Sequence, residues 1–482
     1  MKIPKEELVA ILSQFNPWWR EEKIPDLPTW CRAVFHELMQ WIENPPAQRA
    51  ILLCGPRQVG KTTLLLQAIQ KLVASGVPPA NILYATFDHP VLKLAGLDTV
   101  LEAWRELEPK AEGPEYIFLD EAQFIKNIGT WVKHQIDFFK TKRVVFTGSA
   151  TPLLQTGQES GVGRWHSIRI STLSFYEYLQ IRKISFSSLP QAASLHEIFE
   201  STPAQLYKMT EATTALIGHF HEYLVRGGFP QTALVDSITQ AQRLLREDII
   251  EKVLKRDMTA LFGVRRILEL ELLFIYLCMH DGGLQDTTTI AKELGIAKQT
   301  VHNFIDLFES AYLIYRLPPF GYGKEVLRAR NKIYLSDPAI APAILLKGKT
   351  VLEDAHALGQ CVETAVIGHL FSHCSSRQAR FSYWRNQREK EVDLIVEIDG
   401  TIIPFEVKYQ SQPVQDRDVM GLIELCTQKP SIQQGYVLTK APQDIGLMGR
   451  ATPSNKLARV PVALFCYWLG ASEFMQKNFL LG

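Results

Sequence analysis

The segment that most constrains this chain is GPRQVGKT at positions 55–62. The apolar run AILLC leads into it and the helical pattern KTTLLLQAIQ leads out of it, which is the setting in which GxxxxGK[ST] binds phosphate. Its glycines let the backbone wrap an anion, so that N–H groups and the helix N-terminus face the charge. A chance match in a glycine-containing turn is the alternative, but strand, loop and helix all agree. The segment predicts a P-loop that binds ATP through Gly55, Pro56, Arg57, Gln58, Val59, Gly60, Lys61, Thr62 and Thr63.

Short apolar runs separated by helical stretches predict a parallel sheet with helices on both faces, an α/β fold. These runs are 50–54, 82–87, 116–120, 143–148 and 167–171. Ligands of such sheets bind at the carboxyl ends of the strands, which is where the P-loop begins.

Polar residues at these strand ends are expected to complete a hydrolytic site. Lys61 would contact the β- and γ-phosphates and the Thr62 hydroxyl would ligate Mg²⁺. Asp120 and Glu121 follow the run YIFL, so we expect Asp120 in the Mg²⁺ shell and Glu121 beside the attacking water. Capping of the next helix is the structural alternative for this acidic pair.

Two further polar residues extend the prediction. Ser149, in TGSAT, is placed to act as a polar sensor of the γ-phosphate or the water. Arg164, in GVGRW, is a candidate for the arginine that neutralises transition-state charge, in its own or a neighbouring subunit. A surface salt bridge is the alternative for such a lone arginine.

Composition limits the remaining possibilities. The 482 residues suggest about three domains. The net charge is only +1, so any nucleic-acid binding must come from local patches. Hydrophobic residues make up 46% and charged residues 21%, as in globular proteins, and no apolar run approaches the ~20 residues of a membrane span. The seven cysteines include no CxxC pair, so we expect a cytoplasmic protein without disulfides. Because no apolar run is long enough to span a bilayer, we expect no membrane partner.

Residues 287–309 carry the spacing of a helix-turn-helix, with Gly295 at the turn. A strand-like run and a Pro/Gly-rich stretch follow and suggest a wing. The second helix offers few basic residues to DNA, whereas 324–332 would place Arg328, Arg330 and Lys332 on one face if it were extended. Contact with the DNA backbone and a purely structural packing module are both open.

The segment EVDLIVEIDGTIIPFEVKYQ (391–410) predicts a hairpin that turns at Asp399-Gly400. Counting outward from that turn places Asp393 opposite Glu406, and two opposed carboxylates need a positive partner. Lys408 is one candidate and a divalent ion is another; Mg²⁺ or Mn²⁺ suits oxygen ligands, and Glu363, in a helical stretch, could add a third carboxylate. Such an ion could activate water for phosphodiester cleavage, with Lys408 positioning the water. Solvent-facing charges on an edge strand are the structural alternative.

These motifs together resemble a prokaryotic AAA+ family in which the ATPase is joined to a restriction-endonuclease-like domain of unknown function. The resemblance rests on GPRQVGKTTLL, FLDEAQ, TGSAT, the ES…GR element, LSFYEY, YLVRGGFP, LREDIIEKVLKRD, KIYLSDPAI and VDLIVE…IPFEVK, in this order. It implies an AAA+ core, a helical lid, a winged helix and a C-terminal PD-(D/E)xK nuclease-like α/β domain. Asp393, Glu406 and Lys408 then fall on the nuclease motif, and Glu363 on its upstream helical acid. The implied boundaries are 1–45 for an N-terminal helical segment, 46–180 for the ATPase core, 181–265 for the lid, 266–330 for the winged helix-turn-helix and 331–482 for the nuclease-like domain.

The sequence therefore predicts a Mg²⁺-dependent ATPase that forms a homo-oligomeric ring, hexameric or similar, and acts as a DNA-processing motor, for instance in repair or recombination on branched DNA. Its C-terminal domain would bind DNA, and cleavage of DNA is open. The alternative is a nucleotide-dependent signalling switch or protein-remodelling ATPase whose nuclease-like domain binds a protein partner. A third reading keeps the motor and makes the nuclease-like site a DNA clamp without catalysis.

Overall fold

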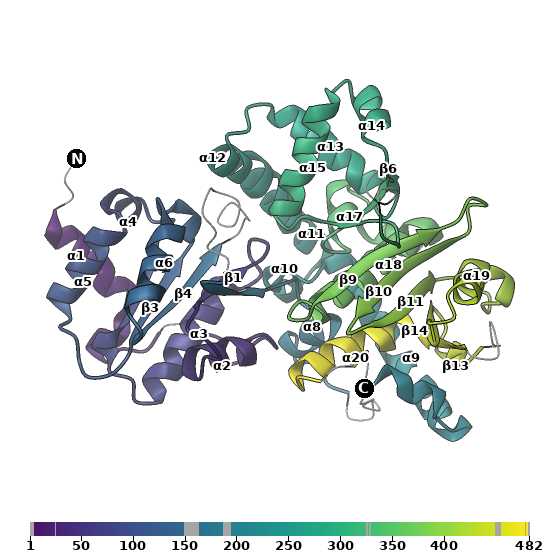
Figure 1. The fold of residues 1–482 in the computed structure, drawn as a ribbon, viewed down its shortest axis with the longest axis horizontal. Coiled ribbons are helices and arrows are strands. Elements are labelled where there is room, and N and C mark those ends of the chain that lie inside the picture. Colours follow the sequence, from purple (N-terminus) through teal and green to yellow (C-terminus); the bar gives the residue numbers. More distant parts are fainter. Residues whose placement is uncertain are drawn as a thin grey trace. The chain divides into compact units, whose positions relative to one another are not determined.

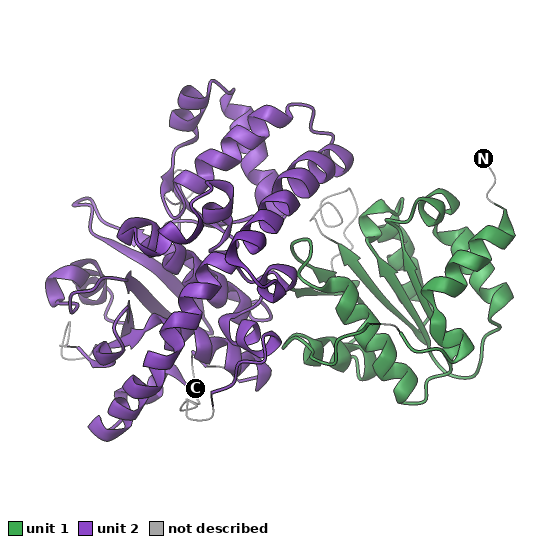
Figure 2. Ribbon diagram, turned by 180° about the vertical axis from the view of Figure 1, so that it is seen from behind, with its two compact units in different colours: residues 1–170 green, residues 171–482 purple. Residues whose placement is uncertain are grey.

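The computed structural model describes residues 4–24, 26–148, 163–186, 194–323, 326, 329–448, 455–477 and 479–480. The chain divides into two compact units, residues 1–170 and 171–482, which Figure 2 distinguishes by colour. Among the described residues, no helix is both long and apolar enough to span a bilayer, and the seven cysteines form no disulfide.

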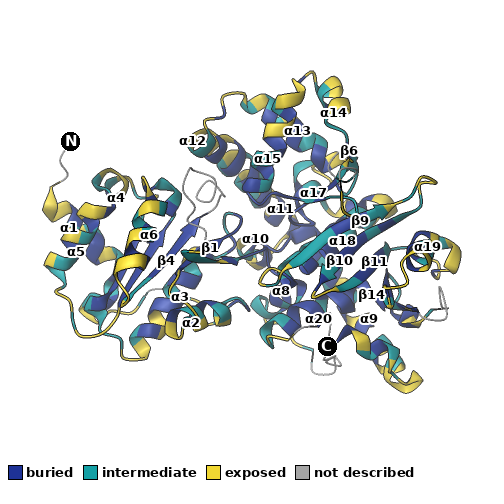
Figure 3. Ribbon diagram, viewed as in Figure 1, coloured by how far each residue is buried: buried dark blue, intermediate teal, exposed yellow. Residues whose placement is uncertain are grey.

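The first unit is built on a five-stranded parallel sheet (Figure 1). Its strand order is β2-β3-β4-β1-β5, so the strand that leads into the P-loop lies between two neighbours. The strands are β1 (Ala50–Cys54), β2 (Ile82–Thr86), β3 (Glu115–Asp120), β4 (Lys142–Gly148) and β5 (Trp165–Arg169). All five residues of β1 are buried, as expected for a strand covered on both faces (Figure 3). The prediction of a parallel α/β sheet from the five apolar runs is confirmed.

Helices flank this sheet, with exposed outer faces and buried inner faces (Figure 3). They are α1 (Lys5–Phe15), α2 (Phe35–Glu43), α3 (Lys61–Ala74), α4 (Pro90–Ala95), α5 (Leu97–Leu107) and α6 (Ile128–Phe138), with short 3₁₀ turns at Pro17–Arg20, Pro79–Asn81 and Ala122–Phe124. The N-terminal segment covers the edge strand β2. The Asn16 side chain donates to Tyr84 O (2.9 Å) and accepts from Tyr84 N (2.7 Å), while the Trp19 indole donates to Ile82 O (2.9 Å). These contacts satisfy backbone groups that an open sheet edge would leave unpaired.

The second unit begins with a helical region. Its helices up to residue 279 are α8 (Phe175–Ile181), α9 (Pro203–Arg226), α10 (Pro230–Leu234), α11 (Ile238–Glu247), a π-helical stretch (Asp248–Asp257), α12 (Met258–Phe262) and α13 (Ile267–Met279), with a 3₁₀ turn at Leu195–Phe199. The helical region is interrupted at RGGFP (226–230), since α9 ends at Arg226. A Cβ on Gly228 would lie 2.5 Å from Leu173 O, and Leu173 N donates to Gly228 O (2.6 Å). The helix therefore ends where the chain must approach another backbone segment closely.

A helix–turn–helix and a small antiparallel sheet follow. Helices α14 (Thr287–Leu294) and α15 (Lys298–Ser310) are separated by a turn that begins at Gly295, and their apolar residues Ile290, Val301, Ile305 and Phe308 are buried. The sheet has the order β6-β8-β7, formed by Leu284–Gln285, Asn331–Leu335 and Ile314–Leu317 respectively. The predicted helix–turn–helix geometry is thus confirmed.

The C-terminal part contains a six-stranded mixed sheet of order β13-β14-β12-β11-β10-β9. Its strands are β9 (Ala379–Arg385), β10 (Glu391–Ile398), β11 (Thr401–Lys408), β12 (Gln434–Thr439), β13 (Gly446–Leu447) and β14 (Lys456–Pro461). The associated helices are α17 (Ile340–Ile344), α18 (Ala355–His373), α19 (Met420–Gln428) and α20 (Val462–Phe474), with 3₁₀ turns at Gly348–Leu352, Asp416–Val419 and Pro442–Asp444. Helices α18 and α20 contact each other and the sheet (Figure 1).

Candidate functional site

The P-loop runs from the end of β1 to the start of α3, as its sequence predicts. Gly55 is required by close packing, because a Cβ there would lie 2.0 Å from the carbonyl oxygen of Ile170. Lys61 is the first residue of α3 and is 5% exposed. Its ammonium donates to Gly55 O (2.8 Å) and Pro56 O (2.6 Å), so it lies against the loop that would hold the phosphates. Burial lowers the pKa of Lys61, although the nearby Glu121 and Asp120 carboxylates oppose that shift.

Asp120, at the end of β3, is 3% exposed and accepts hydrogen bonds from three hydroxyl groups. Thr62 Oγ1 donates to its Oδ2 (2.7 Å), Tyr84 Oη donates to the same oxygen (3.0 Å), and Thr147 Oγ1 donates to Oδ1 (2.5 Å). The P-loop threonine and the strand-end aspartate therefore meet directly. A hydroxyl and a carboxylate in contact beside a P-loop are the groups that ligate Mg²⁺ in nucleotide sites, so the residues present fit the predicted cofactor.

Glu121 follows Asp120 with a left-handed backbone (φ 54°), and its N–H donates to Thr147 Oγ1 (2.9 Å). Its carboxylate accepts a hydrogen bond from the Gln123 amide. Glu121 precedes a 3₁₀ turn, but its side chain does not cap that turn. Glu121 thus occupies the N-cap position of that turn without a capping hydrogen bond from its side chain.

The two outlying candidates have different outcomes. Arg164 Nε lies 2.8 Å from Asp137 Oδ1, in an ion pair at the surface of the same unit. The expected surface salt bridge is thus present, and the role of Arg164 in hydrolysis stays a prediction. Ser149 lies outside the described residues, as do Glu159 and Ser160 of the ES…GR element.

Sequence reasoning missed three residues of this site. Thr147 and Tyr84 hold Asp120, and Arg32 Nη1 donates to Val59 O within the P-loop (3.1 Å). Thr147 begins the TGSAT motif, so its place at a strand end was a usable signal. Tyr84 and Arg32 belong to an apolar strand and a loop, where no motif marks a polar role. Burial, together with the charge and hydrogen bond of Asp120, raises the pKa of Tyr84, so its hydroxyl stays a donor.

The C-terminal hairpin has the register counted from its sequence. Leu394 pairs with Phe405, and Ile398 pairs with Thr401, around the turn at Asp399-Gly400. The carboxylate Oδ2 of Asp393 accepts a hydrogen bond from Val407 N at 2.9 Å. Pairing between β10 and β9 shifts register between Val392 and Ile395, and such an irregularity changes the direction of the side chains there.

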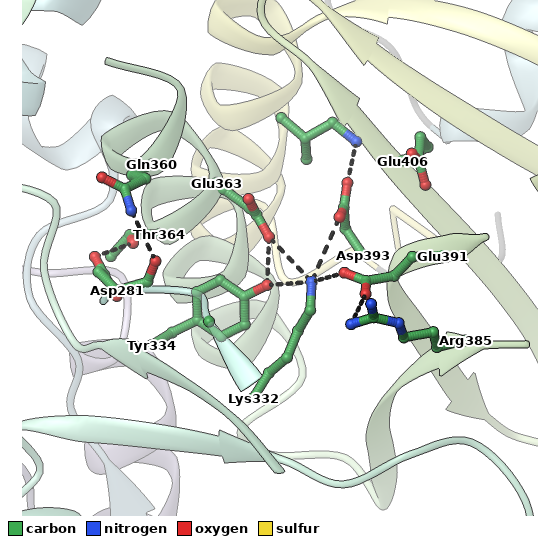
Figure 4. Close-up of polar contacts among 12 residues, drawn as sticks. Asp281, Lys332, Tyr334, Gln360, Glu363, Thr364, Arg385, Glu391, Asp393 and Glu406 are labelled. Atoms are coloured by element: carbon green, nitrogen blue, oxygen red, sulfur yellow. Dashed lines mark hydrogen bonds and ion pairs between the residues drawn. The ribbon is translucent and has the colours of Figure 1, made fainter. Parts of the chain in front are cut away.

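Two lysines neutralise the carboxylates around this hairpin. Lys408 Nζ lies 2.5 Å from Glu406 Oε1, so the predicted Lys408 partner is present. Lys332 of β8, with a 5% exposed side chain, pairs with Glu391 and lies 3.6 Å from Asp393 Oδ1 and 3.7 Å from Glu363 Oε1 (Figure 4). Lys332 therefore lies buried among carboxylates and not on an exposed basic face. Its neighbour Arg330 is exposed and pairs with Asp286 (2.8 Å), and Arg328 lies outside the described residues.

Burial and neighbouring charges shift the pKa values of the groups in this cluster. Burial and the charge of Asp393 raise the pKa values of Glu406 and Glu363 above their usual range. Burial alone would lower the pKa of Lys332, but the Glu363, Asp393 and Glu391 carboxylates raise it above its ordinary value. Among the described residues, no group of three or more His, Cys, Asp or Glu side chains is arranged to hold a metal ion. A metal ion held by Glu363, Asp393 and Glu406 therefore stays a prediction, and the positions of these three side chains do not support it.

Comparison with known proteins places three families along the chain. Residues 47–179 match an AAA domain, 217–350 match a domain of unknown function (DUF8612), and 358–457 match another (DUF4143). An uncharacterized protein of Mycobacterium tuberculosis is 26% identical over 385 residues, which cover 77% of this chain and 73% of that protein. An uncharacterized protein of Methanocaldococcus jannaschii is 27% identical over 357 residues, covering 71% of this chain and 72% of that protein.

Among solved structures, the Aeropyrum pernix Orc1 protein in complex with DNA is 12% identical and aligns with a TM-score of 0.31, covering 67% of this chain and 94% of that chain. The AAA domain match coincides with the described P-loop, the parallel sheet and the Asp120–Glu121 strand end. Residues 47–179 of this chain are thus an AAA-type P-loop ATPase domain.

Proposed function

We propose that the chain is a Mg²⁺-dependent AAA+ ATPase that couples ATP hydrolysis to the remodelling of DNA, as a homo-oligomeric ring in the cytoplasm. The observation that carries the proposal is the meeting of the Thr62 hydroxyl and the Asp120 carboxylate at 2.7 Å, beside Lys61 and Glu121. A P-loop that only binds nucleotide needs no second carboxylate at this strand end.

The roles of the nucleotide-site residues follow from their positions. The backbone of residues 55–63 would cradle the phosphates, and the Lys61 ammonium would exchange the Gly55 and Pro56 carbonyls for phosphate oxygens. Thr62 and Asp120 would hold Mg²⁺, which supplies positive charge to the phosphate oxygens when it is bound. Glu121 would orient the attacking water, with Ser149 as a sensor and Arg164 of a neighbouring subunit at the transition state.

The DNA-directed part of the proposal rests on the helix–turn–helix. The surface of α15 exposes Lys298, Gln299, His302 and Asn303, which are side chains able to bind DNA. We interpret residues 266–330, which include α14, α15 and β7, as a winged helix, residues 181–265 as a lid, and residues 331–482 as a restriction-endonuclease-like domain that engages DNA. Branched or junction DNA of repair or recombination is the substrate class we favour.

A second candidate is a nucleotide-dependent switch or protein-remodelling ATPase, in which these modules bind a protein partner. The net charge of +1 favours it, and so do Asp306 and Glu309 on α15, which both pair with Arg316. The helix that would approach DNA thus carries acidic side chains, and the positive charge of Arg316 on β7 is neutralised.

ATP hydrolysis measured with and without single-stranded, duplex, forked and four-way-junction DNA separates the candidates. The assay is run near 50 mM salt, where contacts to phosphate are strongest. Stimulation by one DNA structure, abolished in Lys61→Ala and Glu121→Gln, is the expected result. ATPase activity that no DNA changes, together with no DNA affinity at this salt, would reject the motor and favour the switch. The same gels report cleavage, and cleavage lost in Glu406→Ala would assign it to the C-terminal domain.

A further inference from the structure

The Lys332 ammonium lies at the centre of the C-terminal carboxylate cluster (Figure 4). It comes from β8, the middle strand of the sheet beside the helix–turn–helix, while its partners come from α18 and β10. Glu391 is its nearest carboxylate, and Asp393 and Glu363 lie within 3.7 Å. The Tyr334 hydroxyl accepts a hydrogen bond from Lys332 at 3.3 Å and donates one to Glu363. The ammonium is therefore surrounded by oxygen atoms.

This arrangement has the chemistry of a cation site. Three carboxylates on two elements converge on one point, and carboxylates brought together out of water are unstable without positive charge. The charge at this point is supplied by a side chain of the chain itself. Glu406, the remaining acid of the predicted metal set, has its own partner in Lys408 and lies apart from Lys332 in Figure 4.

The cluster also joins two parts of the second unit. Tyr334 follows Lys332 by two residues along β8, and both contact Glu363 of α18. A second connection lies beside it, where Asp281 accepts from Leu335 N (2.8 Å) and from Thr364 Oγ1 (2.7 Å), also between β8 and α18. Figure 4 shows the contact of Asp281 with Thr364 beside the Lys332 cluster. Removing the charge of Lys332 would thus weaken the contact between the helix–turn–helix sheet and the C-terminal sheet.

We propose that Lys332 is a tethered counter-ion that occupies the cation position of the Glu363–Glu391–Asp393 cluster, so that the C-terminal domain is held together without a divalent ion at this point. It follows that this cluster does not supply a divalent ion for cleavage. The proposal concerns cation binding by the C-terminal domain alone. It can therefore fail while the proposed ATPase function holds, and the proposed ATPase function can fail while it holds.

The test measures Mn²⁺ binding to the full chain without nucleotide, by electron paramagnetic resonance of free Mn²⁺. An Asp120→Asn background removes the carboxylate of the nucleotide site, which could bind the same ion. In that background, the protein that keeps Lys332 should show no Mn²⁺ binding that requires Asp393. Lys332→Ala should gain one Mn²⁺ site per chain that is lost again when Asp393→Asn is added, and Mn²⁺ should raise the melting temperature of Lys332→Ala but not that of the protein that keeps Lys332.

Lys390→Ala is the matched control, because Lys390 belongs to the same region but pairs with Glu424 (3.0 Å) outside the cluster. It should gain no Mn²⁺ site. If Lys332→Ala does not fold, Lys332→Ala with Glu391→Gln removes one charge of each sign and is measured in its place. The proposal would be overturned if the protein that keeps Lys332 bound Mn²⁺ and lost this binding when Asp393→Asn was added. It would also be overturned if Lys332→Ala gained no Mn²⁺ site.

Discussion

At the residue scale, Thr147 joins the two acidic residues of the nucleotide site. It is fully buried, donates to Asp120 and accepts from the Glu121 N–H. Thr147→Val keeps the shape but leaves both partners without that hydrogen bond, which costs about 1–3 kcal/mol of local interaction. We expect kcat for ATP hydrolysis to fall roughly tenfold or more, with nucleotide affinity little changed. Steady-state kinetics and nucleotide titration measure the two quantities.

Tyr84→Phe is the comparison for this change. It removes one hydrogen bond to Asp120 and leaves Glu121 untouched, so its effect on kcat should be smaller than that of Thr147→Val. Equal losses in both variants would mean that the contact of Thr147 with Glu121 contributes nothing to hydrolysis.

At the scale of elements, the end of α9 depends on the absence of a side chain at Gly228. A Cβ there would lie 2.5 Å and 2.8 Å from the backbone O and N of Leu173, and backbone atoms cannot easily move away. We expect Gly228→Ala to lower the free energy of unfolding by roughly 2–4 kcal/mol. Gly218→Ala, inside the same helix with nothing within 4 Å of the added Cβ, should raise it by up to about 1 kcal/mol. Urea unfolding followed by circular dichroism compares them, and a Gly228→Ala protein as stable as the parent contradicts the expectation.

The contact between α8 and α18 should make the second unit sensitive to acid. His369 Nε2 accepts from Phe175 N (2.7 Å) and its Nδ1 lies 2.6 Å from Ala365 O, which fixes a neutral ring. Burial lowers the pKa of His369 to about 4. The unfolded chain therefore binds more protons between about pH 6.5 and 4, and stability on the order of 3 kcal/mol is lost as the pH falls through that window.

The substitution His369→Gln tests this pH dependence. A glutamine can still accept from Phe175 N but does not titrate, so the slope of stability against pH between 6.5 and 4 should decrease. Urea unfolding of both proteins at several pH values measures it. An unchanged slope would show that other groups, such as the buried His373 with a pKa lowered to about 3, account for the acid sensitivity.

At the scale of the whole molecule, the proposed ring predicts that active sites are shared between subunits. Lys61→Ala and Arg164→Ala proteins should each hydrolyse ATP poorly, and a mixture should recover activity at interfaces that combine an intact P-loop with an intact Arg164. Asp137→Asn removes the ion-pair partner of Arg164 but keeps the arginine, so it should remain active. Mixing experiments over a range of ratios measure the recovery. A mixture no more active than its components would place Arg164 outside the catalytic site.

The sequence was sufficient where a local pattern determines the geometry. The P-loop, the strand end at Asp120 and the turn at Asp399-Gly400 each depend on a few consecutive residues, and their positions were predictable. Tyr84, Thr147 and Lys332 act on residues more than 25 positions away in the chain, so no local pattern marks their partners. Lys332 lies among other basic residues in the sequence, and nothing in that segment indicates that its partners are carboxylates of α18 and β10.

The connection between strands β7 and β9 has a practical consequence for dividing this protein. Phe320 N donates to Tyr383 O (2.6 Å), Tyr383 N donates to Pro318 O (3.0 Å), and the Tyr383 hydroxyl donates to Arg330 O (2.7 Å). Cutting the chain near residue 330 would separate these hydrogen-bonding groups and leave them open to other chains. A fragment ending there would be prone to aggregate through these unpaired groups. The helix–turn–helix and the C-terminal sheet should therefore be expressed together, as one piece.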